Sequence, residues 1–176
     1  MPGAANQREL DATNPWEIIP QGLFSRHFDL HRGGQLVAAL RMSLWTEGCE
    51  FTIAGHPFAI RRVSLWRDGF QLFTGDQSVC EVKRSFWSRR FELSAVDEKW
   101  ILQPAGWFTR TYQLLAGERE VGQRQVGTIR PTGWLTRQRV AEFADEVPPP
   151  VQVFAIFLVL VISQRQQKHA AAGGGG

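Results

Sequence analysis

VQVFAIFLVLVIS, residues 151–163, is the stretch of this 176-residue chain that decides its fold. Val153 to Ile162 are apolar without a break, and three consecutive prolines, 148–150, stand before the stretch. A membrane-spanning helix needs roughly 20 apolar residues, whereas runs of about 10–14 are more often buried core helices. A helix over these residues has no polar face, so it needs apolar surroundings on every side. The sequence therefore predicts a helix over 151–163 that the rest of the protein encloses.

Two other interpretations of this segment stay open. A tail-anchored transmembrane helix is the first, although polar residues bracket the run at Glu146 and again at Gln164–Lys168. A buried strand is the second, because six of the thirteen residues are Val or Ile, whose branched side chains favour strands.

The middle of the chain repeats a pattern in which an aromatic residue is followed two positions later by Leu or Ile. Residues two apart point to the same face of a strand. Turn residues such as Gly33-Gly34 and Gly75-Asp76 follow most of these starts and favour tight hairpins. Each unit therefore predicts a β-hairpin, and two further strands are expected within 16–24 and 135–143. The five starts are Phe28-Asp-Leu30, Phe51-Thr-Ile53, Phe70-Gln-Leu72, Phe91-Glu-Leu93 and Tyr112-Gln-Leu114.

About twelve short strands predict a sandwich or a barrel, and closure into a barrel removes exposed sheet edges. A barrel of that size is too wide to be filled by its own side chains, so the apolar helix suits its axis. The predicted fold is mainly β: a closed, roughly twelve-stranded antiparallel barrel, built of hairpins around a central hydrophobic C-terminal α-helix. Residues 15–168 are expected to form it, between a disordered N-terminus at 1–14 and a flexible Ala/Gly tail at 169–176.

This layout resembles the tubby C-terminal-like superfamily, which includes the tubby proteins, the phospholipid scramblases and the LURP-one-related proteins. The resemblance covers roughly residues 16–168 and rests on the repeated hairpin starts and on the segment from Pro150 to Ser163. It implies a twelve-strand barrel closed around a hydrophobic helix, as in the small bacterial scramblase-like members. It also implies that basic residues on the barrel surface bind anionic lipid headgroups. The calcium-binding acidic segment of scramblases has no D-x-[DN]-x-[DN]-G counterpart here.

The basic charge of the chain is concentrated in its middle. The formal net charge is +3, and residues 61–139 hold 14 Lys+Arg against 8 Asp+Glu. Cationic side chains beside Trp66 and Trp87 suit anionic headgroups at a membrane surface, with Trp at the interface. Binding of single-stranded nucleic acid by stacking is less favoured, and a plain solvated surface stays open. The candidate anion- or lipid-binding residues are Arg61, Arg62, Arg67, Lys83, Arg84, Arg89 and Arg90.

Catalytic and metal-binding patterns are nearly absent from the sequence. It contains no nucleophile-elbow, P-loop or dinucleotide-binding motif. His27 and His31 have a helical zinc spacing but fall in a predicted strand and its turn, and Cys49 and Cys80 have no zinc spacing. We therefore expect no catalytic residue, no metal and no cofactor, and two buried or semi-buried thiols.

The expected function is that of a non-enzymatic barrel module that binds anionic lipid headgroups or another anionic surface. A scramblase-like protein with its C-terminal segment inserted in the membrane is one alternative, and a structural or protein-interaction module is another. Residues 1–7 lack the apolar region of a secretory signal, which favours a cytoplasmic protein, peripheral at the membrane. Anionic membrane lipid is the expected partner, nucleic acid is an unfavoured one, and the sequence names no protein partner.

Overall fold

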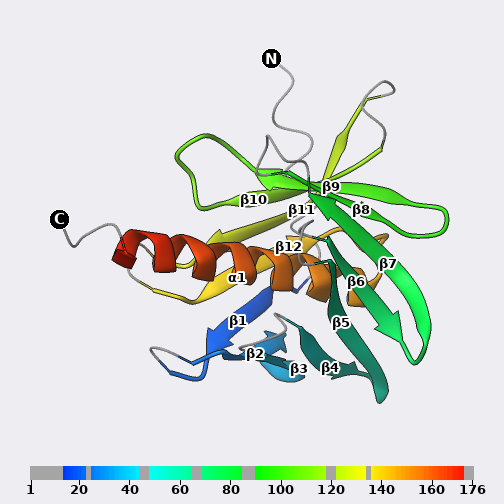
Figure 1. Cartoon of the computed structure of the whole chain (residues 1–176), viewed down its shortest axis with the longest axis horizontal. Coiled ribbons are helices and arrows are strands. Elements are labelled where there is room, and N and C mark those ends of the chain that lie inside the picture. Colours follow the sequence, from blue (N-terminus) through cyan, green and yellow to red (C-terminus); the bar gives the residue numbers. More distant parts are fainter. Residues whose placement is uncertain are drawn as a thin grey trace.

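The structure is a computed structural model that describes residues 14–22, 25–43, 48–64, 69–84, 90–117, 122–133 and 136–172. Twelve strands form a closed antiparallel barrel, and one helix, α1 (Pro149–Ala172), passes through it (Figure 1). The strands follow one another around the barrel in chain order, and β1 pairs with both β2 and β12, which closes the sheet. The predicted fold class is therefore confirmed.

Every aromatic-x-Leu or Ile start identified in the sequence lies in an even-numbered strand. In β2, Phe28 and Leu30 are buried while His27 is exposed, as the period of two requires. Gly33 and Gly34 turn the chain between β2 and β3 with φ of 58° and 76°, a region that favours glycine. The strands are β1 (Trp16–Pro20), β2 (His27–Arg32), β3 (Gln35–Met42), β4 (Cys49–Ile53), β5 (His56–Ser64), β6 (Gly69–Thr74), β7 (Gln77–Arg84), β8 (Phe91–Ser94), β9 (Lys99–Pro104), β10 (Tyr112–Ala116), β11 (Arg124–Pro131) and β12 (Arg139–Phe143).

Helix α1 occupies the axis of the barrel, and its residues 151–161 are all buried. The rings of Phe157 and of Phe70 on β6 lie edge to face, with ring centroids 5.5 Å apart. The buried-strand interpretation of this segment is therefore wrong. The helix extends beyond 151–163 at both ends, and it includes residues 169–172, which the sequence assigned to the tail.

Gln152 is the one polar side chain in the buried part of α1, and its hydrogen bonds are satisfied inside the protein. Its Oε1 accepts a hydrogen bond of 2.6 Å from the Trp16 indole, and its Nε2 donates one of 2.7 Å to the Val147 carbonyl. Buried polar groups are tolerated when they are paired in this way. This contact joins the start of α1 to β1.

Cys49 and Cys80 are free thiols, and both are buried, as the sequence predicts. Burial raises the pKa of each thiol to about 12, so both remain protonated at neutral pH.

The barrel has two different ends, because each strand reverses direction and alternate connections meet on the same side. At the turn end lie the short turns 33–34, 54–55 and 75–76, the connections 95–98 and 117–123, and the start of α1. At the loop end lie the connections 21–26, 43–48, 65–68, 85–90, 105–111 and 132–138, together with the C-terminal part of α1. In Figure 1 the helix runs horizontally, with its orange N-terminal part on the right and its red C-terminal part on the left.

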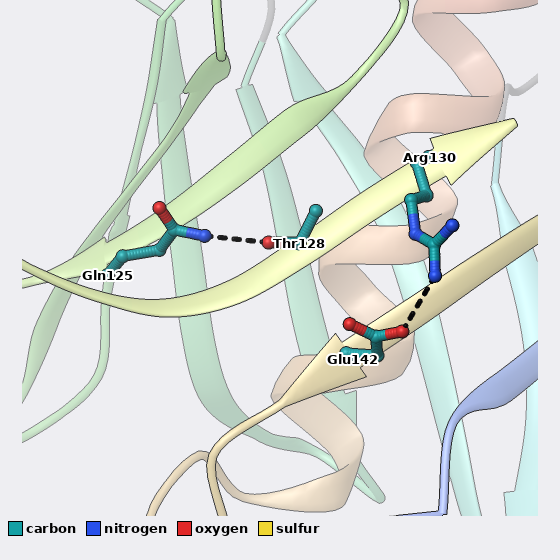
Figure 2. Close-up of polar contacts among 4 residues, drawn as sticks. All are labelled: Gln125, Thr128, Arg130 and Glu142. Carbon is teal, nitrogen blue, oxygen red and sulfur yellow. Dashed lines mark hydrogen bonds and ion pairs between the residues drawn. The ribbon is translucent and has the colours of Figure 1, made fainter. Parts of the chain in front are cut away.

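Polar contacts on the sheet occur both between neighbouring strands and within one strand. Figure 2 shows Arg130 of β11 donating a hydrogen bond of 3.0 Å to the Glu142 carboxylate of β12. In the same view Gln125 donates one of 2.7 Å to the Thr128 hydroxyl along β11. These contacts are solvent-accessible, so each contributes at most about 1 kcal/mol.

Candidate functional site

The structure places Arg61 and Arg62 on opposite faces of β5. Adjacent strand residues point to opposite sides of a sheet, and Arg62 pairs in register with Phe70, which is buried. Arg61 is exposed on the outer face, where its guanidinium lies 5.1 Å from the centre of the Phe73 ring. These two residues therefore do not share one surface.

The outer face around Lys83 carries both signs of charge. Lys83 is exposed and forms an ion pair of 3.1 Å with Glu81, two positions earlier on β7. Glu92 of β8 lies directly opposite Lys83, and Glu81 occupies the same row of the sheet as Arg61. Carboxylates among the cations weaken the attraction of this face for an anionic surface.

Arg90 lies just before β8 and is buried, with no hydrogen-bond partner for its Nε among the described atoms. Arg67, Arg89 and the side chain of Arg84 lie outside the described residues. The described members of the predicted site, Arg61, Arg62, Lys83 and Arg90, thus divide between the outer face, the inner face and the buried interior.

Charges at the two ends of the barrel are segregated more clearly than on its outer face. In the described parts of the turn-end connections the charged residues are all acidic, whereas in those of the loop-end connections they are all arginines. The acidic residues are Asp76, Asp97, Glu98, Asp145 and Glu146, and the arginines are Arg26, Arg90, Arg110 and Arg137. The loop end is therefore the side that an anionic partner would approach.

Two large aromatic side chains project from the loop end. Trp107 and Phe108 form the tip of the 105–111 connection and are 93% and 103% exposed. The Ala105 amide donates a hydrogen bond of 2.9 Å to the Thr111 carbonyl and closes the base of this loop. Exposed aromatic side chains held on a closed loop are typical of a contact surface.

A second loop at this end repeats the first in sequence and in geometry. GWFTR at 106–110 and GWLTR at 133–137 differ at one position of five. The Thr132 amide donates to the Gln138 carbonyl at 3.2 Å, as Ala105 does to Thr111. A Cβ built on Gly106 or on Gly133 would lie 3.5 Å from the methyl carbon of the threonine three residues later. The two loops therefore present Arg110 and Arg137 from equivalent positions.

A cavity of about 480 Å³, called the mouth cavity below, opens between these two loops and the side of α1. Its apolar wall comes from strands and helix, and the helix also supplies polar side chains. None of the described residues that line it is Asp or Glu. The lining includes Phe28, Tyr112 and Leu160, the arginines Arg110, Arg137 and Arg139, the exposed Trp107 and Phe108, and Ser163 of α1.

Arg139, the first residue of β12, is a buried cation at the inner side of this cavity. It is 9% exposed, and its guanidinium donates hydrogen bonds of 2.7 Å to the Ser163 hydroxyl and 3.4 Å to the Arg110 carbonyl. The Ser163 hydroxyl in turn donates one of 2.7 Å to the Val159 carbonyl. Burial is the main cause that lowers the pKa of Arg139; the nearby Tyr112 acts in the opposite direction, and the Arg110 charge has a smaller lowering effect.

Arg137 connects the second loop to the first connection of the chain. Its guanidinium donates hydrogen bonds of 3.5 Å and 3.0 Å to the carbonyls of Gly22 and Ser25 and lies 5.5 Å from the centre of the Phe28 ring. Burial lowers the pKa of Arg137 as well. Two loops and one strand thus contribute three arginines to the lining of one cavity.

Sequence reasoning missed these arginines because it followed the local density of Lys and Arg. Arg110, Arg137 and Arg139 are spread over thirty residues and converge only when the barrel closes. The duplicated GW[FL]TR sequence was the available signal. No group of three or more His, Cys, Asp or Glu residues able to hold a metal occurs in the described part of the chain.

These features define the class of protein: a closed twelve-strand antiparallel barrel, threaded by an apolar helix, with an arginine-lined cavity at its loop end. Comparisons of the chain with models of protein families, with curated proteins and with solved structures found no match.

Proposed function

We propose that this protein is a non-enzymatic binding module that docks its loop end onto an anionic lipid surface. The observation that carries the proposal is the pair of fully exposed aromatic side chains, Trp107 and Phe108, beside arginines at one end of the barrel. Trp sits favourably at a membrane interface, and arginines near the surface are attracted to anionic lipid. The acidic connections at the turn end would orient the protein with its loop end toward the membrane.

Insertion of α1 into a membrane is the alternative with a specific observation behind it. The segment Pro149–Gln167 is long and apolar enough to cross a membrane by length and composition. Most of this segment is buried inside the barrel, however, where Phe154 and Phe157 have no exposed surface. Removing the helix would expose the apolar lining of every strand to water, at roughly 25 cal/mol for each Å². This cost favours docking over insertion.

We further infer that the chain is a tubby C-terminal-like protein of the small scramblase-like type, peripheral at the cytoplasmic side of a membrane. The support is architectural: a closed twelve-strand barrel around a buried C-terminal helix is the arrangement that the resemblance implies. A shared fold does not establish a shared ligand. The lipid proposal therefore rests on the loop end itself.

Flotation of detergent-free protein with vesicles of phosphatidylglycerol and phosphatidylcholine tests the proposal. We expect binding at low salt that weakens at high salt, because salt screens surface charges. The double variant Trp107→Ala/Phe108→Ala should lose most of this binding. Its control is Leu36→Ala/Val96→Ala, which removes two exposed apolar side chains at the turn end and should bind as the unmodified protein does. Absence of flotation at any salt concentration would instead favour a protein-interaction module, and equal loss in both variants would contradict the assigned surface.

A further inference from the structure

The mouth cavity contains a buried positive charge that the described protein does not neutralise. Arg139 donates to a serine hydroxyl and to a main-chain carbonyl, both of which are uncharged acceptors. None of the ion pairs between described residues involves it. By contrast, the exposed Arg124 and Arg130 each pair with a glutamate, Glu146 and Glu142.

A buried cation without a counter-ion is costly, because desolvation is not offset by an opposite charge. Arginine keeps its proton at neutral pH even when burial lowers its pKa, so Arg139 cannot escape this cost by becoming neutral. Residues that reduce stability in this manner are typical of binding sites, where the ligand supplies the missing interaction. The Ser163 hydroxyl fixes the orientation of the guanidinium from the side of α1.

The lining of the cavity determines the kind of anion that fits. Guanidinium groups form forked hydrogen bonds with carboxylates and phosphates. Arg110 and Arg137 add two further positive charges to that of Arg139, and the described residues that line the cavity include no carboxylate. Three cations suit a phosphate monoester, which carries about −1.5 to −2 charges at neutral pH, better than a singly charged carboxylate.

The apolar wall indicates that the anion carries a hydrocarbon chain. Leu160 and Tyr112 line the cavity together with the arginines, and Trp107 and Phe108 line it on the solvent side. Arg139 is buried and bonded to α1, so the charged group would lie deepest and the chain would point outward past the aromatic tip. The volume is within the range of small-ligand sites, which span about 300–1,000 Å³.

We propose that the mouth cavity binds a phosphate monoester attached to an alkyl chain, with the phosphate against Arg139 and between Arg110 and Arg137. The inference deepens the proposed function, since such a group occurs at the head of a membrane lipid, but it also occurs in soluble alkyl phosphates. A lipid bound in this way would keep its chain in the bilayer while its headgroup enters the barrel.

Titration calorimetry with octyl phosphate below its micelle concentration tests this inference without a membrane. We expect saturable binding of one molecule, weaker binding of octanoate and little binding of octanol. Arg139→Gln should weaken octyl phosphate binding about 10- to 100-fold, the change expected from losing charge-assisted hydrogen bonds in a buried site. Arg130→Gln, which removes an exposed arginine from the outer face, is the matched control and should bind unchanged.

Arg139→Lys guards against a failure of the glutamine variant to fold. Lysine retains the positive charge but cannot form the two parallel hydrogen bonds of a guanidinium group. Arg139→Lys should therefore still weaken binding, while its melting temperature remains close to that of the unmodified protein. Inorganic phosphate should compete with octyl phosphate only at much higher concentration, because it lacks the chain. Equal binding by Arg139→Lys, Arg130→Gln and the unmodified protein would overturn the assignment.

Flotation with vesicles, measured alongside octyl phosphate binding, distinguishes a failure of this inference from a failure of the proposed function. Flotation with phosphatidylglycerol that persists while octyl phosphate fails to bind would overturn the cavity ligand and leave surface docking in place. Octyl phosphate binding without flotation would support the cavity ligand from a soluble source and contradict surface docking. Addition of phosphatidic acid, whose headgroup is a phosphate monoester, should increase flotation of the unmodified protein more than that of Arg139→Gln.

Discussion

The turn end and the loop end of this barrel are made by the same twelve strands, yet their chemistry is opposite. At the turn end, tight glycine turns and acidic connections surround the start of α1, and both ends of the buried Gln152 amide are hydrogen-bonded. At the loop end, exposed aromatic side chains and arginines surround a cavity, and the partners of the buried Arg139 among the described residues are neutral. The comparison teaches that satisfied contacts secure the helix at one end, while the other end retains unsatisfied charge suited to a ligand.

A charge in the middle of α1 should unfold the turn end and the loop end together, and so remove the difference between the two ends. Phe157→Asp places a carboxylate against the Phe70 ring with no exposed surface, and we expect a loss of about 4–5 kcal/mol or more of unfolding free energy. Such a loss is comparable to the whole stability of many domains. Urea denaturation followed by circular dichroism measures it, with Phe157→Leu as the milder apolar control. Unchanged melting of Phe157→Asp would mean that the helix is not packed inside the barrel.

A methyl group added near the turn end should destabilise the protein more than one added at the loop end. A Cβ at Gly127 of β11 would lie 2.5 Å from the Phe143 ring and 3.2 Å from Leu114, so Gly127→Ala should cost about 1–3 kcal/mol. At Gly106 the nearest atom is 3.5 Å away, so Gly106→Ala should have little effect. Equal denaturation midpoints for the two variants would contradict the close packing at Gly127.

Two of the glutamines of α1, Gln152 and Gln164, offer a second matched pair. Gln152→Leu leaves the Trp16 indole and the Val147 carbonyl without their partner, and we expect a loss of about 1–3 kcal/mol. Among the described residues, the Gln164 side chain has one hydrogen-bond partner, the Met42 sulfur at 3.7 Å. Gln164→Leu should therefore change the free energy of unfolding by less than about 0.5 kcal/mol. Thermal melts of both variants, recorded in parallel, measure the difference. A larger loss for Gln164→Leu would reverse the assigned roles of the two ends.

Removal of the buried charge at the loop end should change the free energy of unfolding less than Phe157→Asp, Gly127→Ala or Gln152→Leu does. Any change should be a gain in stability rather than a loss. Arg139→Met replaces a desolvated cation by an apolar side chain, and we expect unchanged stability or a gain of up to about 1 kcal/mol. Octyl phosphate binding should disappear in the same variant. A loss of more than about 2 kcal/mol in urea denaturation would show that Arg139 stabilises the fold and would weaken its assignment as a binding residue.

Much of the fold was predictable because local patterns specify it. The aromatic-x-Leu or Ile pairs such as Phe70-Leu72 place two apolar side chains on one face. All five occur in strands, and every member is buried except Ile53, which is partly buried. The unbroken apolar run from Val153 to Ile162 required an enclosed environment, and residues 153–161 of α1 are buried inside the barrel. The exact extent of the helix was less predictable, because Gln164 to Ala172 are compatible with either a helix or a tail.

The sequence indicated the charge of the expected partner but not which residues form the candidate site. Arginine and tryptophan in neighbouring positions indicated an anionic partner, but density along the chain favoured Arg61 and Arg90, which the barrel does not bring to one surface. The arginines of the mouth cavity come from two loops and one strand. Their convergence depends on which connections share an end of the barrel, and strand pairing decides that.

The sequence by itself determined the strands, the glycine turns and the burial of the helix, because each follows from the period and chemistry of nearby residues. Tertiary structure alone decided that Arg139 lies against Ser163 of α1 and that Arg110 and Arg137 face the same cavity. The physical reason is that side-chain periodicity acts over a few residues, whereas the position of a charge relative to water is set only after the barrel has closed around its helix.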